Sequence, residues 1–213
     1  MPKTQGYENN AQHYDDWFDK NPEVYQAEIA AIKQLLPEGK GVEIGAGSGR
    51  FTQPLNIHTG VEPAQKMREI ALKRELNVIE GVAESLPLAD KTFDFATFIT
   101  STCFLDNPQL AYQEAFRVIK DQGSIIIAFL EKDSEMGKAY EAHKHNDPLF
   151  CDATFYSYDQ IESMLKQAGF SQFKTVQTVL PESETHKTTD ILNGHDQGTF
   201  VIVRAEKSQK ESL

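Results

Sequence analysis

Short apolar runs alternate with amphipathic segments along most of this chain. The runs are rich in β-branched and aromatic residues and have the length of buried strands. They cover residues 41–45, 56–61, 78–79, 93–99 and 124–129. Segments with apolar residues at helical spacing cover 63–75, 107–119 and 158–168. This alternation predicts an α/β domain in which crossover helices join parallel strands.

Proline and asparagine mark further boundaries. The segment 7–36 mixes apolar and charged residues and is interrupted by Asn21-Pro22, so two helices are expected before Pro37. Tyr14, Trp17 and Phe18 would form the packing face of the first of these helices. A brief helix limited by Pro54 is expected after the first strand.

The C-terminal part of the chain departs from the strand and helix alternation. A strand at 170–179 is followed by the polar segment 181–197 and then by a strand at 199–205. Because no crossover helix separates these two strands, they are expected to pair as a hairpin, with the final strand antiparallel in the sheet. Residues 131–157 also break the alternation and are predicted to be an insertion in a single domain, 1–213.

Three alternating glycines, Gly45, Gly47 and Gly49, end the first apolar run. Glycine adopts positive φ and lets a ligand touch the backbone, so this stretch predicts a strand that turns sharply over a nucleotide-type ligand. Glu43 precedes the loop at a position that is usually apolar in dinucleotide loops, and Arg50 stands where those loops have glycine. A ligand that has an ammonium group and no phosphates fits this loop better.

A second carboxylate, Glu62, lies nineteen residues after Glu43, at the end of the next apolar run. A carboxylate at the end of the second strand can accept hydrogen bonds from both hydroxyls of a ribose. The two acids together therefore favour a nucleoside ligand with a cationic part.

Five segments in this order resemble the class I S-adenosylmethionine (SAM)-dependent methyltransferases, and within them the methyltransferase type 11 group. The resemblance covers about residues 7–204. It is carried by Val42-Glu43-Ile44-Gly45-Ala46-Gly47-Ser48-Gly49, Gly60-Val61-Glu62-Pro63, Gly81-Val82-Ala83-Glu84-Ser85-Leu86-Pro87-Leu88, Phe93-Asp94-Phe95-Ala96 and Glu114-Ala115-Phe116-Arg117-Val118-Ile119-Lys120-Asp121-Gln122-Gly123.

The resemblance implies a Rossmann-like fold with a seven-stranded, mostly parallel sheet, an antiparallel final strand and helices on both faces. It also implies that SAM is the cofactor and that helices within about 7–36 and the insertion at about 131–157 form a lid. The residues that it places at the cofactor are Tyr14, Glu43, Gly45, Ala46, Gly47, Gly49, Glu62, Pro63, Met67, Ala83, Glu84, Thr100 and Phe104. Met67 could equally be a core methionine.

The chain departs from the family pattern at Val82. Many relatives have an aspartate there that accepts a hydrogen bond from the adenine amino group, and valine cannot accept one. Glu84 or a water would have to replace it, whereas the backbone amide of Ala83 can meet the adenine ring with any side chain.

The implied reaction is an in-line displacement at the methyl carbon of SAM, with S-adenosylhomocysteine leaving. Positioning alone suffices for an anionic acceptor, and a base is needed if the acceptor keeps its proton. Weak candidates for that base are His13, His143 and Tyr14. Cys103 is a small packed residue in this interpretation, because methyl transfer from a sulfonium needs no nucleophile from the protein.

The insertion is the expected site of acceptor specificity. Its segment 143–147 contains two histidines and an aspartate, but Lys144 between them repels a cation, so a solvated lid face is favoured and no metal is expected. Phe150, Phe155 and Tyr156 either pack against the domain or stack on the acceptor.

Composition narrows the partners. The formal net charge of −11, without a run of lysine or arginine, argues against nucleic acid and favours a small or basic acceptor. No apolar stretch has the length of a membrane span, and there is no signal core at the N-terminus. The two cysteines favour reduced thiols. A cytoplasmic monomer or homodimer is therefore expected.

Two alternatives remain at this stage. A nicotinamide-dependent oxidoreductase would also use a glycine loop and an acid after the second strand, although Glu43, Arg50 and the terminal hairpin count against it. A non-catalytic SAM-binding protein would keep the cofactor residues and have less use for two long insertions.

Overall fold

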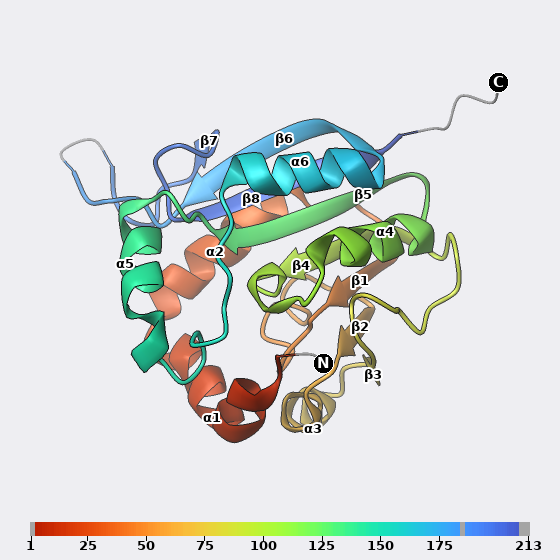
Figure 1. Ribbon diagram of the computed structural model, residues 1–213, viewed down its shortest axis with the longest axis horizontal. Helices are drawn as coiled ribbons and strands as arrows, with labels where there is room; N and C mark the ends of the chain where they lie inside the picture. The colour runs from red at the N-terminus through yellow and green to blue at the C-terminus, as the bar shows by residue number, and fades with distance from the viewer. Residues whose placement is uncertain (1–2, 184–185, 209–213) are drawn as a thin grey trace.

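The computed structural model describes residues 3–183 and 186–208 (Figure 1). Within these residues one mixed sheet has the strand order β3-β2-β1-β4-β5-β8-β6-β7. Its strands are β1 (Gly41–Ile44), β2 (Thr59–Glu62), β3 (Val78–Glu80), β4 (Phe93–Ile99), β5 (Ile119–Leu130), β6 (Phe170–Thr178), β7 (Leu192–Asn193) and β8 (Phe200–Lys207). The α-helices are α1 (Gln5–Lys20), α2 (Pro22–Leu35), α3 (Gln65–Lys73), α4 (Pro108–Val118), α5 (Glu135–His143) and α6 (Tyr158–Ala168).

The sheet confirms the predicted topology. Strands β1 to β5 pair in parallel, and β8 lies between β5 and β6 and is antiparallel to both. The two-residue strand β7, inside the polar segment 181–197, adds an eighth strand at the edge. No helix of the described residues is both long and apolar enough to cross a membrane.

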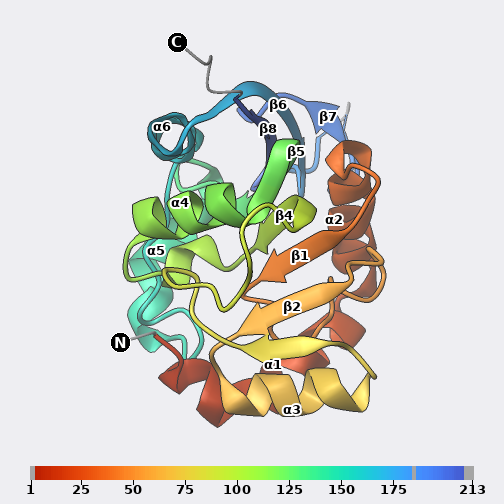
Figure 2. The same ribbon diagram turned by 90° about the vertical axis from the view of Figure 1, so that its right-hand side faces the viewer.

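Helices cover both faces of the sheet, as Figure 2 shows. The alternation of side chains along β5 decides which core each residue joins, because successive strand residues point to opposite faces. Ile125 and Ile127 pack with α4 and α6, whereas Ile126 and Ala128 pack with α1 and α2. All four side chains are fully buried, so β5 forms the centre of both cores.

Capping residues explain two helix boundaries. The Asn107 side chain accepts a hydrogen bond from the amide of Leu110 and begins α4, and Ser157 forms a capping box with Gln160 at the start of α6. Gly169, with φ of 103°, ends α6 in the left-handed region.

The expected brief helix after the first strand is wrong: residues 50–56 form hydrogen-bonded turns. Pro54 has no N–H to donate to the carbonyl of Arg50 four residues earlier, so a regular helix cannot form through this segment. The hydroxyl of Tyr25 in α2 donates to that carbonyl instead. The Tyr25 hydroxyl thus takes the place of the N–H donor that Pro54 lacks.

Other boundaries also differ from the predictions, such as that of β2, which begins at Thr59 and not at 56. Helix α3 begins at Gln65, because Pro63 lies before the helix and Ala64 is its N-cap. Strand β5 begins at Ile119 and not at 124, because residues 120–123 form a bulge in its pairing with β4.

Candidate active site

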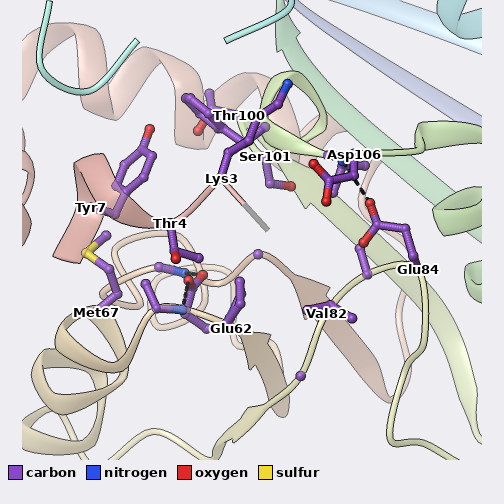
Figure 3. A pocket seen from close by; sticks show the side chains of 18 of the residues that line it. Lys3, Thr4, Tyr7, Glu62, Met67, Val82, Glu84, Thr100, Ser101 and Asp106 are labelled. Atoms are coloured by element: carbon purple, nitrogen blue, oxygen red, sulfur yellow. Dashed lines mark hydrogen bonds between the residues drawn. The ribbon is translucent and has the colours of Figure 1, made fainter. Parts of the chain in front are cut away.

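A pocket opens at the carboxyl ends of β1, β2 and β4 (Figure 3). Ligands of open α/β sheets bind at this edge. The space in and in front of it, including the part that is open to solvent, is about 740 Å³. Ten of the thirteen predicted cofactor residues line it: Tyr14, Gly45, Gly47, Glu62, Pro63, Met67, Ala83, Glu84, Thr100 and Phe104.

Glu62 is the buried carboxylate of this pocket, with 7% of its surface exposed. One oxygen accepts a hydrogen bond from the amide of Ala64 and the other from the amide of Gly47, each at 2.8 Å. Burial raises the pKa of Glu62 to about 7 despite these two hydrogen bonds. Each oxygen keeps a second lone pair, so the carboxylate is held in place and can still accept two hydroxyl groups.

Two glycines shape the loop for different reasons. Gly47 has φ of 55°, and a Cβ there would lie 3.3 Å from Cε of Met67 and 3.8 Å from the ring of Tyr14, both of which line the pocket. A side chain at this position would therefore crowd the pocket. Gly45 has φ of 76°, and a Cβ would lie 2.5 Å from Cβ of Ser101, whose hydroxyl donates to the carbonyl of Ile44.

The other three predicted residues lie beneath the loop. Glu43 is 1% exposed and accepts a hydrogen bond of 2.6 Å from the Thr52 hydroxyl, while burial raises its pKa to about 8. Ala46 is buried. Gly49 is covered by Leu76, whose Cδ1 would lie 2.1 Å from an added Cβ. These residues therefore support the loop from inside the protein.

Thr100 combines strain with a contact to the N-terminal helix. It follows β4 with φ of 50°, a left-handed conformation that is rare for a β-branched residue. Its amide donates to the carbonyl of Ala128 and its side chain hydrogen-bonds to the hydroxyl of Tyr14. Such strain is typical of ligand sites that the surrounding structure over-determines. Sequence patterns give no signal for it.

Glu84 has a structural contact as well as a place in the pocket wall. One of its oxygens accepts hydrogen bonds from the amides of Asp106 and Asn107, at 2.9 and 3.1 Å. It thereby ties the loop after β3 to the loop after β4 (Figure 3). Asp106 lines the same pocket, and sequence reasoning missed it.

The N-terminal segment contributes more to the pocket than the sequence indicated. Lys3, Thr4 and Tyr7 line it together with the expected Tyr14. The ring of Tyr7 lies edge-on to Tyr14 at 5.5 Å and to Phe104 at 5.0 Å. Phe18, in contrast, is a core residue, and Trp17 is 38% exposed.

Ion pairs hold helix α1 across the glycine loop. Asp15 accepts hydrogen bonds from the Ser48 hydroxyl and from both Arg50 and Arg74, at 2.7 to 3.0 Å. The Glu8 carboxylate receives the first amides of α3. Helix α1 is therefore fixed to the glycine loop and to the start and end of α3.

The base candidates are not brought together. Tyr14 lines the pocket, and burial raises its pKa well above the usual value, so its hydroxyl stays protonated. His13 is exposed on α1, and His143 is exposed on α5 with Nδ1 2.9 Å from the carbonyl of Ala139; neither lines the pocket. Burial raises the pKa of Cys103 to about 12, which keeps the thiol unreactive.

The histidine-rich segment of the insertion forms no metal cluster. Among the residues that the structure describes, no group of three or more histidine, cysteine or acidic side chains is placed to hold an ion. Lys144 donates to the carbonyl of Ala153 at 2.8 Å and pairs with Glu141 at 2.8 Å.

Two features define the class of site. The antiparallel strand β8 pairs with β5, the last of the parallel strands, and the glycine loop after β1 contacts the buried Glu62 after β2. Together they are typical of a nucleoside-binding, methyltransferase-like site. Comparisons with known proteins agree. A family model described as a methyltransferase domain matches residues 42–127. An uncharacterized protein of Methanocaldococcus jannaschii is 40% identical over 201 residues, which span 94% of this chain and 98% of that protein.

Solved structures also include methyltransferases that resemble this chain. One is a SAM-dependent methyltransferase of Thermotoga maritima, described as a possible histamine N-methyltransferase. It is 40% identical with a TM-score of 0.92, and the match covers 96% of this chain and 100% of that chain. Phosphoethanolamine N-methyltransferase 2 of Haemonchus contortus, crystallised with SAM, has a TM-score of 0.62 at 16% identity and shares the fold alone; the match covers 86% of this chain and 53% of that one.

The chain belongs to the class I SAM-dependent methyltransferases. SAM is its cofactor, and the nicotinamide alternative is set aside.

Proposed function

We propose that this enzyme methylates a small-molecule acceptor and that the pocket of Figure 3 binds SAM. The observation that carries the proposal is the state of Glu62. Its two oxygens are fixed by the amides of Gly47 and Ala64, each oxygen keeps a second lone pair, and Glu62 lines the pocket. This arrangement suits the two hydroxyl groups of a ribose.

The other pocket residues fit the rest of the cofactor. Gly47 lines the pocket without a side chain, so the ligand can approach the loop backbone there. Thr100 follows β4 and lines the pocket together with Tyr14 of α1, where the methionine part is expected. The amide of Ala83 and the wall residues Met67 and Val82 are proposed to surround the adenine.

When bound, SAM supplies a methyl carbon that is activated by the neighbouring sulfonium and can be displaced in line by a nucleophile. The protein therefore has to position the acceptor and exclude water. Helix α1, fixed by Asp15, covers the pocket, and Tyr7 and Phe104 close its wall with aromatic rings. Tyr14, which stays protonated, is proposed to orient ligands as a hydrogen-bond donor and not to act as a base.

Three observations support a small acceptor. The aromatic wall of the pocket continues through Phe104 to Phe150 of the insertion. The net charge of −11 disfavours nucleic acid. The Thermotoga maritima relative is described as a possible histamine N-methyltransferase, which places small amines among the acceptors to be screened.

The test is isothermal titration with SAM, S-adenosylhomocysteine and NADH in turn. We expect micromolar binding of the first two and none of NADH. Glu62→Ala is expected to weaken SAM binding roughly 10- to 100-fold, the effect of losing hydrogen bonds to a charged group.

Glu80→Ala is a matched control. Glu80 is the register partner of Glu62 on the neighbouring strand β3, but it is exposed and pairs with Arg68. Its removal should leave SAM affinity unchanged. Equal SAM affinity in wild type and Glu62→Ala would contradict the site assignment, and binding of NADH without SAM would overturn the function.

A further inference from the structure

A second, smaller pocket lies beside the cofactor pocket. Three segments build it: the loop after β4, the end of β5 and the insertion between β5 and α6. They contribute, in this order, Thr100 and Cys103, then Leu130, then Phe150, Phe155 and Tyr156. The space in and in front of this side pocket is about 300 Å³, less than half of that at the cofactor pocket.

Thr100 is the wall that the two pockets share. It lines both of them, and its strained left-handed backbone is held by two hydrogen bonds. Its amide donates to the carbonyl of Ala128, and its carbonyl accepts from the Cys103 thiol at 3.4 Å. The ring centroid of Phe104 in the cofactor pocket lies 5.8 Å from that of Phe150 in the side pocket. A group in the side pocket is therefore one residue away from the cofactor.

The lining of the side pocket is uncharged. Among the described residues that line it there is no acid, lysine, arginine or histidine, and most of its surface belongs to apolar atoms. The Thr102 hydroxyl is paired with that of Tyr112 at 3.1 Å, and the Cys103 thiol donates to Thr100. Burial raises the pKa of Tyr156, so this phenol stays neutral. A charged group would find no ionic partner here, so the side pocket favours an uncharged apolar group.

Two phenylalanines of the insertion close the side pocket. Their ring centroids lie 5.8 Å apart, and Tyr140 of α5 contacts both rings, at 5.4 Å from Phe150 and 6.0 Å from Phe155. Phe155 is 3% exposed and belongs to the protein's own packing, whereas Phe150 is partly exposed. Of these two residues, Phe150 is the one with surface left for a ligand.

We propose that the side pocket binds an uncharged apolar group of the methyl acceptor, with the acceptor's reacting atom next to Thr100 and facing the cofactor. This inference rests on the proposed function and adds the substrate class, a molecule that carries an alkyl or aromatic part beside the methylated atom. An acceptor with a charged group in place of that part is disfavoured, because the lining offers no partner for it. Phe150 limits the length of the apolar group and is thereby a specificity-determining residue.

The experiment uses neutral probes of increasing length. The protein is saturated with S-adenosylhomocysteine, so that the cofactor pocket is filled, and 1-alkanols from 1-propanol to 1-octanol are titrated by NMR. In wild type each added methylene is expected to tighten binding roughly fourfold until the side pocket is full, after which the affinity levels off.

Nuclear Overhauser contacts show where the probe lies. The terminal methyl group of the alkanol should contact the methyl groups of Leu130, and its hydroxymethyl group should contact the homocysteine methylenes of the bound S-adenosylhomocysteine. The second contact is the one that an isolated void in the protein would not give, because it requires the probe to reach past Thr100.

Phe150→Ala tests the limit on length. Removing the ring enlarges the side pocket, so the ratio of 1-octanol affinity to 1-propanol affinity should rise at least about fourfold, the effect of one methylene. Phe173→Ala is the matched control, because Phe173 is also a partly exposed phenylalanine and lines neither pocket. This variant should keep the wild-type ratio.

A probe pair tests the preference for an uncharged group in wild type, so its result does not depend on the folding of a variant. 4-Amino-1-butanol has an ammonium group where 1-pentanol has its terminal methyl group. Its affinity should be at least about tenfold lower than that of 1-pentanol.

Each outcome separates this inference from the function on which it rests. The side-pocket assignment is wrong, and the cofactor site stands, if wild type binds S-adenosylhomocysteine but alkanol affinity is independent of length, if the ammonium probe binds as well as 1-pentanol, or if the probe contacts only one of its two expected neighbours. An unchanged length ratio in folded Phe150→Ala would contradict the role of Phe150. If wild type does not bind S-adenosylhomocysteine, the proposed function itself fails.

Discussion

The buried carboxylates at the glycine loop and the one in helix α2 differ in their partners. Glu62 receives two backbone amides and Glu43 receives the Thr52 hydroxyl, so the protein holds both in place. Glu28 in α2 is also buried, with 7% of its surface exposed, but no described residue donates a hydrogen bond to it. The two regions therefore differ in how far the protein fixes the carboxylate that it buries.

The elements around the pocket also differ in what they contribute. Strand ends and short loops of the parallel sheet line the pocket, where the backbone itself supplies hydrogen-bond donors. Helices α1 and α5, from the N-terminal segment and the insertion, contribute aromatic side chains. Side chains can change without disturbing the sheet, so one scaffold can serve many ligands.

The largest effect that tests this comparison is expected at the glycine loop. Gly47→Val should weaken SAM binding by about 100-fold or more, because the side chain would crowd the pocket next to Met67 and Tyr14. The left-handed backbone there should also lower the free energy of unfolding by about 1–2 kcal/mol. Titration calorimetry and urea unfolding measure the two effects separately.

Gly49→Ala is the matched control within the same loop. Its Cβ would collide with Leu76 inside the protein, so the free energy of unfolding should fall by roughly 1–3 kcal/mol while SAM affinity of the folded fraction changes little. Similar losses of affinity in both variants would show that the loop responds as a unit and that Gly47 does not face the ligand.

The second effect concerns the cost of the unpartnered Glu28. Its pKa is about 8 in the folded protein against 4.5 as the ordinary value, so the folded state binds more protons and stability falls as pH rises between these values. Glu28→Gln removes this loss. At pH 8 the variant should be more stable than wild type by on the order of 3 kcal/mol, and at pH 5 the two should be nearly equal.

Urea unfolding at pH 5 and pH 8 measures this difference, with Glu23→Gln as the exposed control on the same helix. Other groups titrate equally in wild type and variant, so the change in the difference reports Glu28 alone. If wild type and Glu28→Gln differ in free energy of unfolding by the same amount at both pH values, Glu28 is solvated or paired in solution. The contrast between Glu28 and the hydrogen-bonded Glu43 and Glu62 would then be lost.

Much of the sheet and the cofactor wall could be predicted because their signals are local. Strand β4 was bounded correctly by one apolar run, and the antiparallel β8 follows from the missing crossover helix. The glycine pattern and the acid after β2 placed Gly47 and Glu62 in the pocket. Each of these features depends on a short stretch of sequence whose chemistry has few structural solutions.

The remainder depends on contacts between distant segments. The helix expected before Pro54 does not form, and the carbonyl of Arg50 accepts a hydrogen bond from Tyr25, which lies 25 residues earlier in the chain. Asp106 and Tyr7 enter the pocket because of how loops and α1 are arranged. In the sequence Glu28 is one of several charged residues of an amphipathic helix, and only the packing of α2 shows that it is buried.

The smallest effect concerns the pH dependence of SAM binding. The pKa of Glu62 is raised to about 7 in the ligand-free protein, so below pH 7 the carboxyl is mostly protonated. A protonated carboxyl loses an acceptor and must ionise before it can receive two ribose hydroxyls. The dissociation constant for SAM should therefore rise up to about tenfold for each pH unit below 7 and be nearly flat just above it.

Calorimetric titrations from pH 5.5 to pH 8 in wild type and Glu62→Ala isolate this group, since every other titrating group is shared. The variant should bind more weakly at pH 8 and lose the steep part of the profile, so that the two curves converge as pH falls. Parallel curves would instead mean that the amides of Gly47 and Ala64 keep Glu62 ionised throughout. In that case pre-organisation of the cofactor side would include its charge as well as its geometry.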